Sequence, residues 1–336
     1  MNQDLHNDVA IVAIGRNEGE RLKLCLRSAI TQAQIVVYVD SGSTDGSVAF
    51  AHSLGCHVVQ LDPARPFGPA RARNEGFDAA LAASPGVAFI QFLDGDCELI
   101  DGWLQQGIAA LHARADVAIV CGNVREVHPE ASVYNKLCDL EWQKAPGEIL
   151  ACAGRFIVRP AVFRAVSGFR PDVIAAEDDE FCIRVRRAGW KILQLDVEMA
   201  RHDAAILRFG QWWLRARRAG LAYAQVAALH GRGQERTFVR DCRSIWLWGL
   251  ALPVAALALA PFTHGLALLA LPCAYAFLFG RIFAYGLQRG WSPRNARIYA
   301  WFTTLSKFPG LHGMLIYHKQ RLTGARQRIT EHYEYK

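Results

Sequence analysis

Four short apolar runs alternate with segments of helical spacing over the first hundred residues of this chain. The runs are Val9–Ile14, Ile35–Val39, His57–Leu61 and Val87–Leu93. This alternation predicts an α/β fold with a doubly wound sheet, in which helices cover both faces of mostly parallel strands. Farther on, the pattern predicts strands at 117–120, 156–158 and 191–195 and a helix at 178–188, so we expect the sheet to be mixed.

Acidic residues follow two of these predicted strands. Asp40 ends the second run, and Asp94 and Asp96 end the fourth. Ligands bind at the carboxyl ends of strands in sheets of this type, so we expect these side chains to share one site. An Asp-x-Asp at the mouth of a buried strand can hold a divalent metal against a diphosphate. A second acidic run, residues 177–180, can supply a general base. Together they predict sugar transfer from a nucleotide diphosphate.

The distribution of charge predicts contact with a membrane. Residues 244–280 contain no Asp, Glu, Lys or Arg, although the chain as a whole has a net charge of +7. Basic residues outnumber acidic ones by six in 201–243 and by eight in 281–336, whereas residues 1–200 are acidic overall. Basic flanks around an apolar segment favour anionic lipid and place the flanks in the cytoplasm.

The apolar segment predicts a helical hairpin at the inner face of the cell membrane. Residues 245–262 provide 18 uncharged positions, near the ~17–25 that span a bilayer as a helix. Residues 265–280 provide 16 more after a tight connection at Thr263 and His264. Three prolines interrupt the run, so a buried or re-entrant hairpin remains the alternative to full spanning.

Four regions follow from these patterns: a catalytic domain at 1–202, a linker helix region at 203–243, a membrane hairpin at 244–288 and a basic interfacial tail at 289–336. In the linker, an aromatic and Arg-rich helix is expected at Ile206–Leu229. It either packs on the domain or lies at the membrane interface. One helical face is predicted to carry Ile206, Phe209, Trp213 and Ala216.

Cysteine usage and the chain start exclude several classes. The nine cysteines are scattered singly with no C-x-x-C pair, which fits a reducing compartment and argues against a disulfide framework or a structural zinc site. Residues 1–8 are polar, so no cleavable signal peptide is expected. The sequence has no zinc-finger, RNA-recognition or basic-zipper pattern, so no nucleic-acid partner is expected.

Several segments, taken together, resemble glycosyltransferase family 2, which has the GT-A fold, and specifically its membrane-associated members. The resemblance covers about residues 8–200 and depends on the order and spacing of the segments. They are Val12-Ala13-Ile14-Gly15-Arg16-Asn17-Glu18, Val39-Asp40-Ser41-Gly42-Ser43-Thr44-Asp45-Gly46, Ala72-Arg73-Asn74-Glu75-Gly76, Asp94-Gly95-Asp96, Gly154 to Arg159, Gly168-Phe169 and Glu177-Asp178-x-Glu180. Arg16 stands where the family more often has Tyr, and Ser41 replaces an Asp of the family pattern.

The resemblance implies a role for each matching residue. Those expected to contact the nucleotide sugar are Ala13, Asn17, Glu18, Asp40, Arg73 and Asp94. Asp96 would bind a divalent metal, Mg²⁺ or Mn²⁺, and Asp178 would be the catalytic base. Glu177 would orient Asp178 or bind the acceptor.

Three residues, His202, Asp40 and Asp45, have two interpretations. From its position after the last predicted strand, His202 could complete the metal shell or could be a hydrogen-bonded structural histidine. Asp40 and Asp45 could instead cap the following helix, and we favour capping for Asp45.

The expected function is metal-dependent transfer of one sugar, with inversion, to a membrane-associated acceptor such as a lipid-linked sugar or glycolipid in cell-surface glycan synthesis. A polyprenyl-phosphate sugar synthase is the enzymatic alternative, and a catalytically dead membrane scaffold is the alternative of another class. A processive polysaccharide synthase fits less well, because residues 211–215 do not match its Gln-x-x-Arg-Trp motif. A dehydrogenase is disfavoured, since residues 15–20 lack G-x-G-x-x-G.

Overall fold

The structure is a computed structural model that describes residues 8–233 and 235–324. The chain divides into two compact units. The first contains Met1–His128 and Glu141–Ala204, and the second contains Pro129–Leu140 and Ala205–Lys336. Each unit is described separately below.

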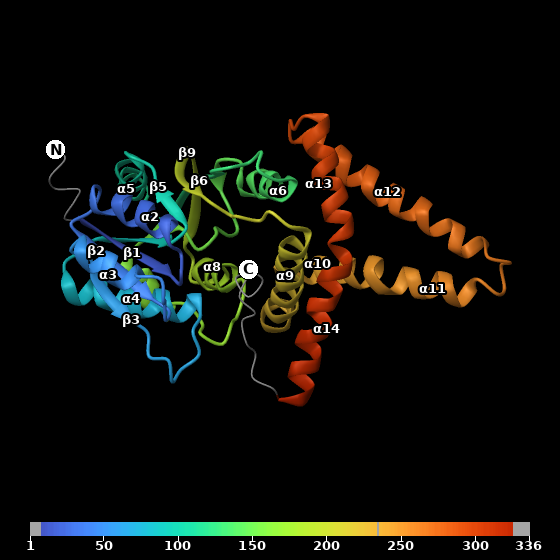
Figure 1. The fold of residues 1–336 in the computed structure, drawn as a ribbon, viewed down its shortest axis with the longest axis horizontal. Coiled ribbons are helices and arrows are strands. Elements are labelled where there is room, and N and C mark those ends of the chain that lie inside the picture. The colour runs from blue at the N-terminus through green and yellow to red at the C-terminus, as the bar shows by residue number, and fades with distance from the viewer. Residues whose placement is uncertain (1–7, 234, 325–336) are drawn as a thin grey trace. The chain divides into compact units, whose positions relative to one another are not determined.

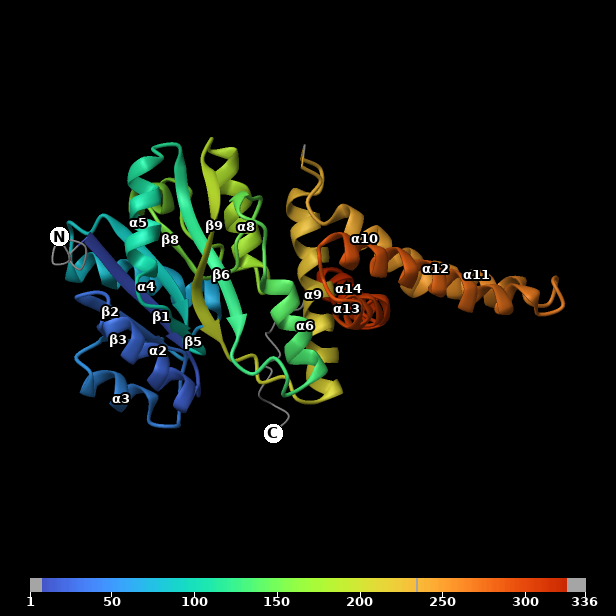
Figure 2. The same cartoon turned by 90° about the horizontal axis from the view of Figure 1, so that it is seen from above.

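The first unit is built on one mixed sheet with helices on both faces (Figure 2). Its strands are β1 (Val9–Gly15), β2 (Ile35–Asp40), β3 (His57–Gln60), β4 (Phe89–Asp94), β5 (Cys97–Leu99), β6 (Val117–Glu126), β7 (Gly147–Glu148), β8 (Phe156–Val158) and β9 (Lys191–His202). Its helices are α2 (Glu20–Ile30), α3 (Ser47–Ser53), α4 (Pro69–Ala83), α5 (Trp103–Ala113), α7 (Pro160–Ala165) and α8 (Glu177–Arg187).

The four amino-terminal strands confirm the predicted doubly wound topology. The sheet order is β3-β2-β1-β4-β8-β6-β9-β5, and β1 to β4 pair in parallel. Their apolar, β-branched sequences suit strands that are covered on both faces. The chain moves outward from β1 to β3 and then returns to β4, so right-handed crossovers place α4 on the face opposite α2 and α3. The carboxyl ends of β1 and β4 therefore flank a topological switch point, where open sheets bind ligands.

The remaining strands bring distant segments to the end of β4. β8 pairs antiparallel with β4, with Phe92 opposite Phe156, and this places residues 154 and 155 beside Asp94. β5 pairs antiparallel with β9, with Cys97 opposite His202. Aromatic side chains from β4, β8, α7, α8 and the loop between these two helices pack together. They are Phe92, Phe156, Phe163, Phe169 and Phe181.

The second unit is helical (Figure 1). Its elements are α9 (Phe209–His230), α10 (Val239–Trp246), the π-helix η1 (Leu247–Ala251), α11 (Leu252–Leu259), α12 (Leu266–Gln288), α13 (Pro293–Leu305) and α14 (Lys307–Thr323), together with most of α6 (Val133–Trp142). The predicted basic tail thus contains two helices, α13 and α14, over its described residues.

α11 and α12 form an exposed apolar hairpin, drawn in orange in Figure 1. Two stretches, Val239–Leu259 and Leu266–Gln288, are long and apolar enough to cross a membrane, with mean hydropathies of 1.6 and 1.9. Only 17% and 6% of their most apolar windows are buried, so they are not core helices of this unit. The hydroxyl of Tyr275 in α12 donates a hydrogen bond to the backbone carbonyl of Trp248 in the π-helix η1. This bond links α12 to the segment that leads into α11.

α9 packs against α14 through glycines. A Cβ on Gly220 would lie 2.0 Å from the carbonyl oxygen of Gly310, and a Cβ on Gly313 would lie 1.9 Å from that of Arg217. The aromatic face of α9 differs from the prediction. Trp212 is the buried tryptophan, because it packs against Phe302 and Tyr134, whereas Phe209 is 47% exposed and Ile206 lies before the helix.

Candidate active site

Asp40 closes the loop after β2. One carboxylate oxygen accepts a hydrogen bond from the Tyr38 hydroxyl at 2.9 Å, and the other accepts from the amides of Gly42 at 2.9 Å and Ser43 at 2.8 Å. The side chain is buried at 2% exposure. In this arrangement the Asp40 carboxylate holds the turn that follows β2.

The loops after β1 and β2 are tied together by reciprocal bonds. Asn17 has a left-handed backbone conformation. Its side-chain oxygen accepts a hydrogen bond from the backbone N–H of Thr44 at 2.7 Å, and its backbone N–H donates to Ser43 Oγ at 2.9 Å. Asp45 accepts from the amides of Gly19 and Ser47, so it joins the two loops and holds the start of α3. These contacts make the edge at β1 and β2 a fixed surface.

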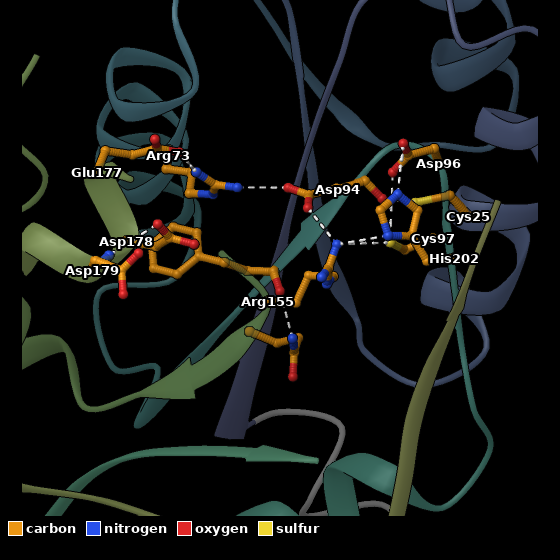
Figure 3. A network of polar contacts seen from close by, with 12 residues as sticks. Cys25, Arg73, Asp94, Asp96, Cys97, Arg155, Glu177, Asp178, Asp179 and His202 are labelled. Atoms are coloured by element: carbon orange, nitrogen blue, oxygen red, sulfur yellow. Dashed lines mark hydrogen bonds and ion pairs between the residues drawn. The ribbon is translucent and has the colours of Figure 1, made fainter. Parts of the chain in front are cut away.

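Arg73 of α4 links the two acidic clusters (Figure 3). Its guanidinium donates to Asp94 at 2.6 Å and to Glu177 at 2.8 Å. Burial alone would lower the pKa of Arg73, but Asp94 and Glu177 raise it above its ordinary value, so the charge is kept. Gly154 provides the space, because a Cβ there would lie 2.1 Å from Arg73 Nη2.

Arg155 is a second buried cation beside Asp94. Its Nη1 donates to Asp94 at 3.0 Å and to Cys97 Sγ at 3.7 Å, and it contacts His202 Nδ1 at 3.0 Å. Glu177, Arg73, Asp94, Arg155, His202 and Asp96 therefore form a continuous network, visible in Figure 3.

Asp96, Cys97 and His202 offer a candidate metal site, since their ligand atoms lie within 4.8 Å of one another. His202 Nε2 is 3.0 Å from an oxygen of Asp96 because β5 pairs with β9. Burial raises the pKa of Asp96, but His202, with Arg21 and Arg155, brings it below its ordinary value. Burial raises the pKa of Cys97 well above its usual range, so Cys97 stays a thiol. Carboxylate oxygens are ligands that suit Mn²⁺ and Mg²⁺, so Asp96 is the group of the three that fits such a cation best.

Asp178 and Asp179 lie in the first turn of α8, next to Glu177. Burial and the charge of Glu177 raise the pKa of Asp178 to about 6, although Arg73 lowers it in part. Burial and the charge of Asp178 raise the pKa of Asp179 as well. A carboxylate with a raised pKa is a better proton acceptor than an exposed one, which suits a general base.

The structure brings Arg73, Asp94, Asp96, Glu177 and His202 into one network and places Asp178 at its edge. Asn17, Glu18 and Asp40 lie in the loops at the neighbouring strand ends, where Glu18 pairs with Arg21 at 2.6 Å. Ala13 is fully buried within β1 between β2 and β4, so its methyl group is covered by protein. A contact between Ala13 and the nucleotide stays a prediction.

Sequence reasoning did not single out Arg155 or Trp142. Trp142 stacks on the ring of His202 with centroids 4.3 Å apart, and Arg155 lies 5.8 Å from the same indole. An isolated Arg before an apolar run gives no local signal of its partners. The pairing of β8 with β4 brings Arg155 to Asp94, and that pairing joins segments about 60 residues apart.

Comparison with known proteins agrees with this geometry. The sequence model of glycosyl transferase family 2 matches residues 10–160, which contain β1 to β4 and the Asp94-Gly95-Asp96 turn. Residues 10–160 of this chain therefore resemble a family 2 glycosyltransferase. The chain is 25% identical over 253 residues to Glycosyltransferase AglE of Haloferax volcanii, with 71% of this chain and 79% of that protein covered. It is 28% identical over 242 residues to the Pre-mycofactocin glycosyltransferase of Mycobacterium tuberculosis, covering 67% of this chain but only 48% of that protein.

Solved structures show that the chain has the GT-A fold. The mannosyltransferase PcManGT of Pyrobaculum calidifontis, in complex with GDP-Man and Mn²⁺, superposes with a TM-score of 0.60 at 20% identity. That match covers 92% of this chain and 87% of PcManGT. Residues 1–349 of S. aureus TarS, in complex with UDP, superpose with a TM-score of 0.50 at 14% identity and cover 94% of this chain and 92% of that one.

Proposed function

We propose that this glycosyltransferase moves one sugar, with inversion at the anomeric carbon, from a nucleotide-diphosphate sugar to a membrane-associated acceptor. The proposal rests mainly on Arg73, which bonds Asp94 at the end of β4 and Glu177 at the start of α8. A donor held at the strand end and an acceptor activated at α8 would then lie in one site. The GDP-Man and UDP bound by the two structural neighbours support this donor class.

Asp96 and His202 would hold a divalent cation, Mg²⁺ or Mn²⁺, which offsets the negative charge that develops on a diphosphate leaving group. Asp94 would contact the ribose or the donor sugar, and Arg73 and Arg155 fix its two carboxylate oxygens from opposite sides. Asn17, Glu18 and the loop closed by Asp40 would form the nucleoside side of the site. These residues orient the donor before any bond breaks, which is a large part of enzymatic rate enhancement.

Asp178 would take the proton from the acceptor hydroxyl while Glu177 orients Asp178 or binds the acceptor. An acceptor hydroxyl is a poor nucleophile near pH 7 until a base removes its proton. The raised pKa of Asp178 suits this transfer. Attack from the side of α8, opposite the leaving diphosphate, inverts the anomeric carbon.

The second unit would attach the enzyme to the cytoplasmic face of the cell membrane. We assign residues 1–202 to catalysis, 203–243 to a linker region, 244–288 to a membrane hairpin and 289–336 to an interfacial tail. The exposed apolar surfaces of α11 and α12 support membrane attachment, and their basic flanks support the cytoplasmic side. Such attachment favours a lipid-linked sugar or glycolipid acceptor, as in cell-surface glycan synthesis.

A nucleotide binding panel tests the donor class. Thermal shifts of the detergent-solubilised protein are measured with UDP, GDP, CDP, ADP and TDP, with and without Mn²⁺. We expect one nucleoside diphosphate to stabilise the protein, and more strongly with Mn²⁺. Stabilisation by a sugar nucleotide with neither transfer nor hydrolysis in native membranes would identify a scaffold and reject the proposal. Asp96→Asn should remove the Mn²⁺ effect while leaving the fold intact.

A further inference from the structure

Arg155 occupies the centre of the polar network between the donor-side carboxylate and the candidate metal site. It lies just before β8 and is only 5% exposed. One nitrogen, Nη1, serves both Asp94 Oδ2 and His202 Nδ1, each at 3.0 Å (Figure 3). Its Nε is buried and has no hydrogen-bond partner within the described part of the chain. Arg155 thus has bonding capacity that the protein's own groups do not use.

The contact with Arg155 fixes which nitrogen of His202 carries the proton. A guanidinium group has donors only and no acceptor. His202 Nδ1 must therefore be the acceptor in this contact, and a neutral imidazole then carries its hydrogen on Nε2. That hydrogen points to Asp96 Oδ2, 3.0 Å away. Both ring nitrogens are consequently engaged within the protein.

This arrangement conflicts with metal binding by His202. A metal ligand must offer a lone pair, and Nε2 is the nitrogen that faces Asp96. For Nε2 to be free, the ring hydrogen must be on Nδ1, where it would meet the N–H of Arg155 at 3.0 Å. Two donors cannot face each other at that distance. Metal-binding histidines instead donate their second N–H to an acceptor such as a carboxylate or carbonyl.

We propose that Arg155 is a positioning residue that competes with a divalent cation for His202. His202 joins the cation only after Arg155 has left Nδ1. This inference rests on the proposed cation site at Asp96. The diphosphate of the donor is the natural acceptor for the released guanidinium, since Arg binds phosphate through paired N–H groups. Cation and donor binding would then be coupled through Arg155. The cation competes with Arg155 for the imidazole, and the diphosphate offers the guanidinium another hydrogen-bond acceptor.

The test is Mn²⁺ affinity of the full-length, detergent-solubilised protein without nucleotide, measured by the loss of the free Mn²⁺ signal in electron paramagnetic resonance. Two variants, Arg155→Met and Arg155→Gln, remove the same positive charge. Only Gln offers a carbonyl that can accept from Nδ1–H. We expect Arg155→Gln to bind Mn²⁺ at least about tenfold more tightly than Arg155→Met, in the range found for altered outer-shell partners of metal ligands.

A second pair of variants shows whether the effect passes through His202. In a His202→Ala background, Arg155→Gln and Arg155→Met should have equal affinities for Mn²⁺. A preference for Gln that persists without His202, or no preference in its presence, would overturn the proposed competition. The loss of Mn²⁺ binding in Asp96→Asn supports the cation site separately. If Asp96→Asn bound Mn²⁺ like the wild type, the cation site itself would be misplaced and both proposals would fail.

The wild-type protein allows a direct measurement of the position of the ring hydrogen. Nitrogen NMR of histidine-labelled protein distinguishes protonated from unprotonated ring nitrogens, and His202→Ala assigns the signals. Without cation we expect His202 to carry its hydrogen on Nε2. Saturating Mg²⁺ with the nucleoside diphosphate should move the hydrogen to Nδ1. A hydrogen already on Nδ1 in the cation-free protein would overturn the proposal.

Discussion

At the scale of a single residue, position 154 must be glycine because the side chain of Arg73 lies directly against it. A Cβ at this position would lie 2.1 Å from Arg73 Nη2, so Gly154→Ala must push the guanidinium away from Asp94 or Glu177. Misplacing a positioning group by about 1 Å can cost about 100-fold in rate, and we expect a loss of that order in kcat/KM. Gly86→Ala is the control, because its Cβ would enter open space. Equal activity of both variants would contradict the role of Arg73.

The base assignment predicts a pH dependence. Asp178 must be ionised to accept a proton, and its pKa is raised to about 6. We expect the rate of sugar transfer to rise with pH and to level off above about pH 6, instead of near pH 4 as for an exposed Asp. Asp178→Asn should lower the rate by about 10²–10⁴-fold with nearly unchanged donor binding. Asp179→Asn is the matched control and should keep activity. A profile that is flat between pH 5 and 7 would exclude Asp178 as the base.

The raised pKa of Asp178 also predicts that the stability of the folded protein depends on pH. The folded protein disfavours ionised Asp178, since its folded pKa lies above its unfolded value. Stability associated with this group is therefore full below about pH 4 and falls as pH rises through about 6. Asp178→Asn should raise the unfolding temperature at pH 7 and lose this advantage as the pH falls to 4. Thermal unfolding at the two pH values measures it, and a destabilised variant at pH 7 would contradict the burial of charge.

The sequence predicted the position of a side chain in the fold where that side chain follows directly from a strand end, whereas the roles of these residues stay predictions. Asp94 and Asp96 lie at such an end, and Arg73 and Glu177 belong to short ordered motifs. The sequence did not show that the side chain of Ala13 would be fully buried, because the pattern of a buried strand does not show which neighbours cover a given side. Arg155 was not predicted, since its role depends on the pairing of β8 with β4.

At the scale of elements, the crossing of α9 and α14 depends on glycine. A Cβ on Gly220 would lie 2.0 Å from the Gly310 carbonyl oxygen, so Gly220→Ala must force the helices apart. We expect it to lower stability by ~1–3 kcal/mol or more, as overpacking does. Gly210→Ala lies on the same helix with open space around its Cβ and should be neutral or slightly stabilising. Thermal unfolding in detergent compares the two, and equal unfolding temperatures would show that the helices do not cross this closely.

Element prediction was accurate for β1 to β4, because each is an apolar run bounded by a helical segment. β5 and β7 contain only three and two residues, too few to establish a period. β9 runs seven residues beyond the predicted Leu195 to His202. The later part of β9 contains exposed polar residues such as Arg201, so its sequence does not resemble an apolar strand. This part of the strand nevertheless places His202 in the site.

At the scale of the whole molecule, the hairpin predicts how the protein partitions. Leu269 is 69% exposed on α12, which fits a side chain facing lipid. Leu269→Lys should shift protein from the membrane fraction to the carbonate-soluble fraction, because a charge in a membrane helix costs about 2.5–3.5 kcal/mol. Leu24→Lys on α2 is the control, since Leu24 is 53% exposed in the first unit. Equal partitioning of both variants would argue against insertion of α12.

If the hairpin is inserted in a bilayer, the acceptor concentration that matters to the enzyme is the concentration within the membrane. Enzyme and lipid-linked acceptor would then meet by diffusion within a surface, and the relevant quantity is the mole fraction of acceptor among the lipids. Adding inert phospholipid at constant total acceptor would slow transfer, although nothing in bulk solution had changed. The cell could therefore regulate this enzyme through the area and composition of its membrane, independently of the nucleotide-sugar supply.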